Sequence, residues 1–250
     1  MAVIIDLNFS SGATYGGWDS TTVDNSGVLA WTAAAAMAGT ATGQASTAGA
    51  SGSHASGLID VTAITSKNLR FRYYLDPNSV TMDNAATQTM IQLKDTSQGA
   101  QNRSNTKLRY LTASGYQLDF DWKNDASSFH GALTVNITDA PHLVECEIVK
   151  ATGASANDGQ YRIWVDGVLG GEQTNIDLFT SFGFNRFMAG PILGGASTNT
   201  RGTLYIDQII VNDDGGTIGP IGPPARAGGG SRSGTSCRGG DGGRLGAYAR

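Results

Sequence analysis

Thr203–Asn212, with the sequence TLYIDQIIVN, is the stretch that decides the fold. Apolar and polar residues alternate in it with a period of two, and the earlier stretch Gln160–Leu169, QYRIWVDGVL, has the same pattern. Such alternation is typical of β-strands that pack one face against a core. The pair Asp166-Gly167 inside the earlier stretch predicts a tight chain reversal. Thr203–Asn212 is the last periodic segment before the glycine-rich end of the sequence, so it is predicted to be the closing strand of a domain.

Short strands are predicted along most of the chain. The expected strands are Val3–Phe9, Leu69–Leu75, Thr89–Leu93, Lys107–Leu111, Tyr116–Trp122, Leu133–Ile137, Leu143–Val149, Tyr161–Val165 and Phe187–Leu193. The low-complexity stretch Thr32–Gly57 is predicted to form small-residue strands and loops, because its glycines interrupt any longer helix. About ten or more short strands without a long helix predict an all-β protein of two packed antiparallel sheets.

The charge distribution divides the chain into two parts. Residues 1–214 carry 12 basic and 20 acidic side chains, a net charge of −8, whereas residues 215–250 carry five arginines and one aspartate, a net charge of +4. We therefore expect a β-sandwich over 1–214 and a Gly/Pro/Arg-rich extended arm or linker over 215–250. The acidic body argues against nucleic-acid binding by the folded domain.

The first residues, MAVIIDLNFSSG, contain neither a basic segment nor a long apolar run, so no signal peptide is predicted. The apolar run Ala33–Ala38 is too short to span a bilayer, and no membrane span is expected. These features predict synthesis in the cytoplasm without a signal peptide. The expected destination is a virion or another extracellular assembly.

The order of these segments resembles the concanavalin A-like, or laminin G-like, jelly-roll superfamily. The resemblance rests on a Trp-bearing loop after the first strand, and on the segments LRFRYYLDPNS (69–79), PHLVECEIV (141–149), YRIWVDGVL (161–169) and GTLYIDQIIV (202–211). It covers roughly residues 3–213 and implies a two-sheet antiparallel jelly-roll sandwich. This fold hosts lectins, glycosidases, lyases and structural modules, so it does not by itself specify a function.

Two pairs of carboxylates are spaced to share one face of a strand. The resemblance to laminarinase-like glycosidases implies a strand with three acids, but Glu145 and Glu147 are followed by Ile148, where the pattern continues with apolar residues. We interpret them as solvated carboxylates at a surface-facing strand edge. No catalytic residue is identified, and the prediction is a protein that is not an enzyme. The second pair, Asp119 and Asp121, either lines a sugar site or forms a polar outer face.

Sugar binding and calcium binding are the other site hypotheses. Aromatic rings bind sugars by stacking on the pyranose C–H surface, and Trp18 and Trp122 have polar or glycine neighbours that favour exposed rings. Packing in the core is the alternative for both. The resemblance also implies a structural calcium ion near the chain ends, for which Asp6 and Asp207 are the candidate ligands. The alternative for Asp207 is a charge that protects a sheet edge.

The basic arm predicts assembly. Its candidate contact residues are Arg226, Arg232, Arg238 and Arg244, which would be attracted to the acidic body of a neighbouring molecule. The predicted function is a non-enzymatic structural or adhesive protein, a bacteriophage virion decoration or fibre component. Expected partners are further copies of the chain, other virion proteins and a cell-surface glycan. The alternative is a carbohydrate-binding domain or degenerate glycoside hydrolase that acts on polysaccharide.

Overall fold

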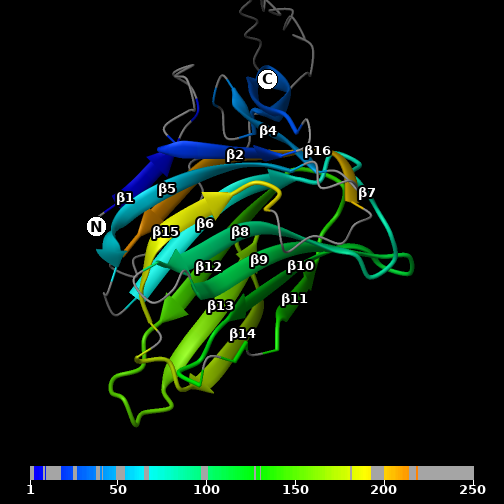
Figure 1. Ribbon diagram of the computed structural model, residues 1–250. Coiled ribbons are helices and arrows are strands. Elements are labelled where there is room, and N and C mark those ends of the chain that lie inside the picture. Colours follow the sequence, from blue (N-terminus) through cyan, green and yellow to red (C-terminus); the bar gives the residue numbers. More distant parts are fainter. Residues whose placement is uncertain are drawn as a thin grey trace, which may run out of the picture.

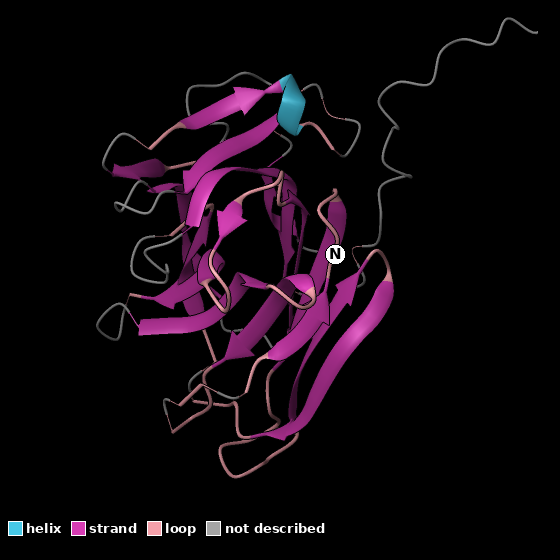
Figure 2. Cartoon of the chain, turned by 90° about the vertical axis from the view of Figure 1, so that its right-hand side faces the viewer, coloured by secondary structure: helices cyan, strands magenta, loops and turns pink. Residues whose placement is uncertain are grey.

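A computed structural model of the chain gives its architecture (Figure 1). It describes residues 3–7, 9, 18–24, 27–37, 40, 42–48, 54–64, 68–96, 101–126, 128–129, 131–180, 182–192, 200–213 and 218. Within these ranges strands dominate, and one short helical turn, η1 (Ala33–Ala35), stands out in Figure 2. Over the same ranges, the structure contains no helix that is long and apolar enough to cross a membrane.

The described residues form sixteen strands. Their bounds are β1 (Val3–Leu7), β2 (Ser20–Asp24), β3 (Leu29–Thr32), β4 (Gly43–Ala48), β5 (His54–Ile64), β6 (Asn68–Asp76), β7 (Thr81–Met82), β8 (Thr87–Asp95), β9 (Gln101–Leu111), β10 (Gly115–Trp122), β11 (Leu133–Asn136), β12 (His142–Val149), β13 (Gly159–Val165), β14 (Val168–Ile176), β15 (Phe184–Ala189) and β16 (Thr200–Asn212).

The strands form the two layers of a jelly-roll sandwich, which confirms the predicted fold. Sheet 1 has the order β11-β10-β9-β8-β15-β5, with β2 paired to β5. Sheet 2 has the order β4-β16-β6-β12-β13-β14, with β1 paired to β16 and β3 to β4. A single pair of residues, Ala48 and His54, connects the two sheets through β4 and β5. All pairings among the described strands are antiparallel.

The sequence predicted the β13–β14 hairpin and closely matched β6, β10, β11 and β12. It placed only the second half of β9 and missed β5 beyond Gly57. β13 and β14 meet at Asp166 and Gly167, whose φ angles of 52° and 79° give the left-handed turn expected of such a pair. The strand predicted at Phe187–Leu193 begins three residues earlier, at Phe184, and ends at Ala189. β2, with the sequence STTVD, was missed because its residues do not alternate in polarity.

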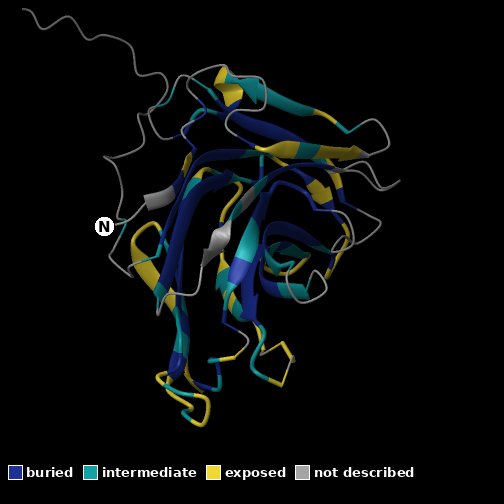
Figure 3. Ribbon diagram, turned by 60° about the vertical axis from the view of Figure 1, so that its left-hand side comes forward, coloured by how far each residue is buried: buried dark blue, intermediate teal, exposed yellow. Residues whose placement is uncertain are grey.

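Aromatic side chains from both sheets meet in the core, which appears as the dark blue centre of Figure 3. Phe71 on β6 in sheet 2 contacts Phe120 on β10 and Phe187 on β15 in sheet 1, with ring centroids 6.0 and 6.1 Å apart in edge-to-face geometry. Phe120 in turn packs against Tyr161 on β13 at 5.6 Å. Alternate residues of these strands are apolar because each strand turns only one face to this core.

Glycines allow two close approaches in the sandwich. A Cβ atom at Gly57 on β5 would lie 2.1 Å from the indole ring of Trp18, so the ring packs directly on the backbone. On β14, a Cβ atom at Gly170 would lie 2.5 Å from Val135, and one at Gly171 would lie 3.2 Å from Leu133. These two glycines let β14, the last strand of sheet 2, approach β11, the last strand of sheet 1.

We expect Gly57→Ala to destabilise the protein by about 1–3 kcal/mol, because the new methyl group overpacks the core against Trp18. Urea denaturation measures the change in the free energy of unfolding, provided that this free energy depends equally on urea concentration in both variants. Gly153→Ala is the control, since no heavy atom lies within 4 Å of its added Cβ atom. Equal stability of the two variants would contradict the described packing of Trp18.

Candidate functional site

The outer surface of sheet 1 carries a continuous set of polar side chains from four adjacent strands. In β9 and β10 these positions alternate with core residues such as Leu108, Leu118 and Phe120, so they point away from the core. We call this set the polar face. It consists of Gln92, Asn105, Lys107, Arg109, Gln117, Asp119, Asp121, Thr134 and Asn136.

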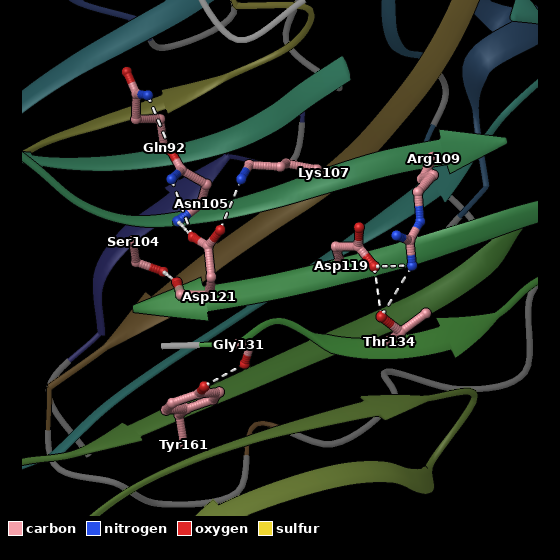
Figure 4. A network of polar contacts seen from close by, with 10 residues as sticks. All are labelled: Gln92, Ser104, Asn105, Lys107, Arg109, Asp119, Asp121, Gly131, Thr134 and Tyr161. Atoms are coloured by element: carbon pink, nitrogen blue, oxygen red, sulfur yellow. Dashed lines mark hydrogen bonds and ion pairs between the residues drawn. The ribbon is translucent and has the colours of Figure 1, made fainter. Parts of the chain in front are cut away.

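Asp121 is the centre of one half of the polar face (Figure 4). The register of β9 and β10 places it opposite Asn105, whose backbone and side-chain N–H groups donate to Asp121 Oδ1 at 3.2 and 3.0 Å. Lys107 Nζ lies 2.7 Å from Asp121 Oδ2. Gln92 on β8 extends the network by donating to Asn105 Oδ1 at 3.0 Å. The carboxylate is therefore held by three donors and is almost completely buried.

Asp119 is the centre of the other half. Its Oδ1 atom lies 3.1 Å from Arg109 NH2 and accepts a 2.7 Å hydrogen bond from the hydroxyl of Thr134 on β11. Arg109 Nε donates to Gln117 Oε1 at 3.1 Å, and Gln117 Nε2 donates to Asn136 at 2.7 Å. Figure 4 shows Asp119 and Asp121 on β10 beside Arg109 and Lys107 of β9. The structure thus brings together the second carboxylate pair that the sequence singled out.

Phe129 adds an aromatic surface to this face. Phe129 is 42% exposed, and the centroid of its ring lies 5.8 Å from Lys107 Nζ and 5.2 Å from Lys123 Nζ. A bridge to Lys123 holds the Phe129 backbone next to the end of β10. Sequence reasoning missed Phe129 because a single aromatic residue in a polar loop belongs to no periodic pattern. An aromatic residue in such a loop is nevertheless a usable signal for a binding surface.

The polar face carries an excess of positive charge, although residues 1–214 are acidic. Its two carboxylates are Asp119 and Asp121. The cations on the face or on strands beside it are Lys94, Lys107, Arg109, Lys123 and Arg186. Arg103, near the start of β9, forms a 2.9 Å ion pair with Asp95, at the end of β8, so the charges of these two side chains cancel. The register of β5 and β15 also places Asp60 opposite Arg186, so apart from the Arg103–Asp95 pair this region has five cations against three carboxylates.

The two tryptophans predicted as exposed sugar platforms are core residues, so that prediction is wrong. Trp122 is completely buried and packs against Phe182 at a centroid distance of 5.8 Å. Trp18 is 4% exposed, and its indole N–H donates to Gln44 inside the protein at 2.9 Å. The polar neighbours of Trp122 misled the interpretation, since a buried strand residue normally has polar neighbours that point outward.

Glu145 and Glu147 do not lie at a strand edge, which corrects the second interpretation. Their strand, β12, lies between β6 and β13 in sheet 2, and both side chains are nearly buried. Arg70 Nε lies 3.4 Å from Glu145 and 3.5 Å from Glu147, and Arg162 NH1 lies 2.9 Å from Glu147. The Arg70 guanidinium also stacks over Trp164 at 4.6 Å. These partners lie on the two strands that flank β12, and the pairing with β6, which is far away in the sequence, could not be predicted locally.

The candidate calcium ligands Asp6 and Asp207 lie on adjacent strands but at different positions along them. Asp6 on β1 is opposite Ile210, whereas Asp207 on β16 is opposite Tyr74. Asp207 is fully buried and accepts hydrogen bonds from the Met37 N–H at 2.7 Å and the Thr40 hydroxyl at 2.6 Å. Over the described ranges, no group of three or more potential metal-ligating side chains occurs. Structural calcium remains a prediction.

The basic arm falls almost entirely outside the described residues, and so do the candidate assembly residues Arg226, Arg232, Arg238 and Arg244. Ile218 is the described residue of this part of the chain, and its backbone N–H donates to Glu145 Oε1 at 3.2 Å. The chain therefore contacts its own sheet 2 at that position. The division into a body and an arm and the role of the arm in assembly remain predictions.

The comparisons with known proteins relate this chain to others by fold. Neither a family model nor a curated protein sequence matches it. Among solved structures, an endo-β-1,4-glucuronan lyase from the fungus Trichoderma reesei aligns with a TM-score of 0.61 and 13% identity, over 84% of this chain and 95% of the other. The cellulose-induced protein Cip1 aligns with a TM-score of 0.57 and 16% identity, over 84% and 97%. A carbohydrate esterase from the Shiga toxin-encoding bacteriophage phi24B aligns with a TM-score of 0.54 and 15% identity, over 84% and 97%.

These neighbours support the resemblance to the concanavalin A-like jelly roll. They also overturn the prediction that the protein is not an enzyme, because proteins of this architecture are named as a lyase and an esterase. That prediction rested on an incomplete glycosidase motif at Glu145 and Glu147. A missing glycosidase motif says nothing about elimination or ester hydrolysis, which do not need two carboxylates at the spacing of a retaining glycosidase.

We expect Asp121→Ala to lower the free energy of unfolding by roughly 1–3 kcal/mol, because the two N–H donors of Asn105 lose their acceptor in a buried setting. Glu172→Ala removes a half-exposed partner of Arg162 and is the control, with an expected cost of about 1 kcal/mol or less. Chemical denaturation of both variants measures the difference. If Asp121→Ala left the free energy of unfolding unchanged, the polar face would be loosely organised.

Proposed function

We propose that the protein recognises an acidic polysaccharide on the polar face of sheet 1. The observation that carries this proposal is the exposed ring of Phe129 beside the ammonium groups of Lys107 and Lys123. A sugar ring can stack its C–H surface on an aromatic ring, while neighbouring cations contact its carboxylate. One short stretch of surface therefore offers both contacts that a uronic acid residue requires.

The polar face also supports recognition of sugar hydroxyl groups. Its amide groups on β8, β9 and β10 lie beside the two carboxylates, and their mutual hydrogen bonds fix the directions of the remaining donors and acceptors. A preorganised surface loses little side-chain entropy when a ligand binds. Arg109 and Lys107 are each about 29% exposed, so both retain N–H groups that face solvent. These groups are available to a bound chain.

The charge of the polar face favours an anionic ligand over a neutral one. Positive groups lie close together here, and burial lowers the pKa of Lys94, which the neighbouring Arg186 lowers further. The negative charge of the rest of the body would direct an anionic chain away from other surfaces. Binding should therefore weaken as salt concentration rises.

Affinity measurements test the proposal. We expect the protein to bind polyglucuronate or alginate and to bind a neutral β-glucan more weakly. Phe129→Ala should weaken binding roughly 2- to 13-fold, the equivalent of about 0.5–1.5 kcal/mol for a lost aromatic contact. Lys123→Ala should also weaken binding and should flatten its salt dependence.

Leu169→Ala is the matched control for Phe129→Ala, because Leu169 is a large apolar residue on β14 that is 49% exposed. Its substitution should leave affinity unchanged. Equal effects of the two substitutions, or the absence of binding to any acidic polysaccharide, would rule the proposal out.

Cleavage of the bound chain by β-elimination is the second candidate function. Elimination from a uronate requires that its carboxylate be neutralised and that a base remove the adjacent proton. Arg109 and Lys107 on the polar face supply the first requirement, and the Asp119 carboxylate beside Arg109 would accept the proton. The electron pair of the broken C–H bond would form the double bond as the adjacent C4–O bond breaks, and the released chain end would take a proton from water. Incubation with polyglucuronate should then produce unsaturated uronate ends, detected by ultraviolet absorbance. Binding without such products would assign the face to recognition alone.

The role in a virion remains a prediction. The bacteriophage origin of one structural neighbour is compatible with it, but a likeness at 15% identity concerns the fold. Adhesion to an acidic cell-surface glycan would unite that prediction with the proposed ligand. Electron microscopy of a native assembly that contains the protein would test it directly.

A further inference from the structure

A cavity of about 360 Å³ lies at the end of the sandwich where the β9–β10 hairpin meets the turn before β7. Its apolar walls are Val80, Met82 and the rings of Tyr110 and Tyr116, and its polar groups come from Ser79, Thr81 and Asp139. The cavity is separate from the polar face, because Arg109, which precedes Tyr110 in β9, and Gln117, which follows Tyr116 in β10, belong to the opposite side of sheet 1. Its volume is within the lower range of small-ligand sites.

The turn at the cavity is held in an unusual backbone conformation. Asn78 and Ser79 have φ angles of +49° and +55°, which residues with side chains seldom adopt. Asp76 accepts a hydrogen bond from the Asn78 N–H at 2.8 Å, and Asn78 Nδ2 donates to the Thr203 carbonyl at 2.7 Å. Strain of this kind persists only where surrounding contacts determine the conformation, and it concentrates at binding sites.

Asp139 joins this turn to the loop after β11. It accepts hydrogen bonds from the Ser79 N–H at 2.8 Å and from the Ser79 hydroxyl at 2.6 Å, one on each carboxylate oxygen. Each oxygen can accept a further hydrogen bond, because a carboxylate offers about four acceptor sites. The residue is exposed, so these acceptor sites are open to a ligand in the cavity.

The neighbouring residues fix the loop that carries Asp139. The Thr138 N–H donates to His142 Nε2 at 3.1 Å, and His142 Nδ1 lies 2.7 Å from Asp166. A backbone N–H can only donate, so Nε2 must be the acceptor and Nδ1 must carry the imidazole proton. Asp166 is itself held by the Leu143 N–H at 2.9 Å. The loop is therefore anchored to the β13–β14 hairpin.

The aromatic wall is equally fixed. Tyr110 and Tyr116 pack edge to face with centroids 5.3 Å apart, and the Tyr116 hydroxyl donates to the Val80 carbonyl at 2.5 Å. Burial, together with the charge of Asp139, raises the pKa of Tyr116 to about 12, so the hydroxyl keeps its proton at neutral pH. The cavity thus combines a rigid apolar wall with hydrogen-bond acceptors at its rim.

We infer that this cavity is a second carbohydrate site, which binds one neutral sugar residue. The C–H face of a hexose matches the apolar wall, and its hydroxyl groups would donate to Asp139 and exchange hydrogen bonds with Thr81 and Ser79. The residues that line the cavity include a carboxylate and no cation, so a uronate would be repelled. This site and the polar face therefore select opposite ligand charges, and the inference does not depend on the proposed function.

Nuclear magnetic resonance titration tests this site on the full chain. Neutral hexoses should shift the backbone amide signals of residues 79–82 and 139, with dissociation constants on the order of 1–10 mM, the range of a few weak contacts. Glucuronate should shift these signals at least 5-fold less at equal concentration. Equal shifts with glucuronate, or no shift with any hexose in the panel, would overturn the inference.

Asp139→Asn should weaken hexose binding at least 5-fold, because it replaces a charged acceptor with a neutral one. Asp158→Asn is the matched control, since Asp158 holds the Thr152 N–H at 2.8 Å and its hydroxyl at 2.7 Å in the same way, at a distance from the cavity lining. If Asp139→Asn disturbs the fold, Tyr110→Leu removes one wall of the site instead. Undiminished binding in a folded variant of either kind would reject the site.

Discussion

Contact between Phe71 of sheet 2 and the rings of Phe120 and Phe187 of sheet 1 is the interaction on which the sandwich depends. It joins strands far apart in the sequence and fixes the separation of the two layers. Because side chains alternate along a strand, placing these rings in the core also decides which residues point outward. Phe120 lies between Asp119 and Asp121, so its burial orients both carboxylates toward the polar face.

The outer faces of the two sheets use charge differently. On sheet 2, Glu145 and Glu147 are matched by Arg70 and Arg162, and the Arg70 guanidinium lies against an indole ring. Charges paired in this way hold neighbouring strands together and offer little to a ligand. On sheet 1, cations exceed carboxylates, and the exposed ring of Phe129 adjoins them. This difference in charge balance and exposure, more than the fold, distinguishes the outer face of sheet 2 from the face for which we propose ligand binding.

Period-two alternation in the sequence was sufficient to predict the β13–β14 hairpin, the long central strands and the shared orientation of Asp119 and Asp121. The same alternation should have placed Trp122 in the core, because its polar neighbours point to the opposite side of the strand. Other features could not be predicted locally. The burial of Glu145 depends on Arg70, a partner from another strand, and the contact between Phe129 and Lys107 depends on how a loop folds back beside β10.

The glycines of β14 have a consequence for how the molecule meets other molecules. Gly170 and Gly171 let the last strand of sheet 2 lie close to Val135 and Leu133 on the last strand of sheet 1. The two sheet margins therefore touch at these glycines, while most of the other residues of β14 are exposed. Uncovered margins recruit strands from other molecules and promote fibrous aggregates. Because Gly170 and Gly171 have no side chain, β14 and β11 can lie in contact at this point, and a strand from another molecule has less access to the sheet margins there.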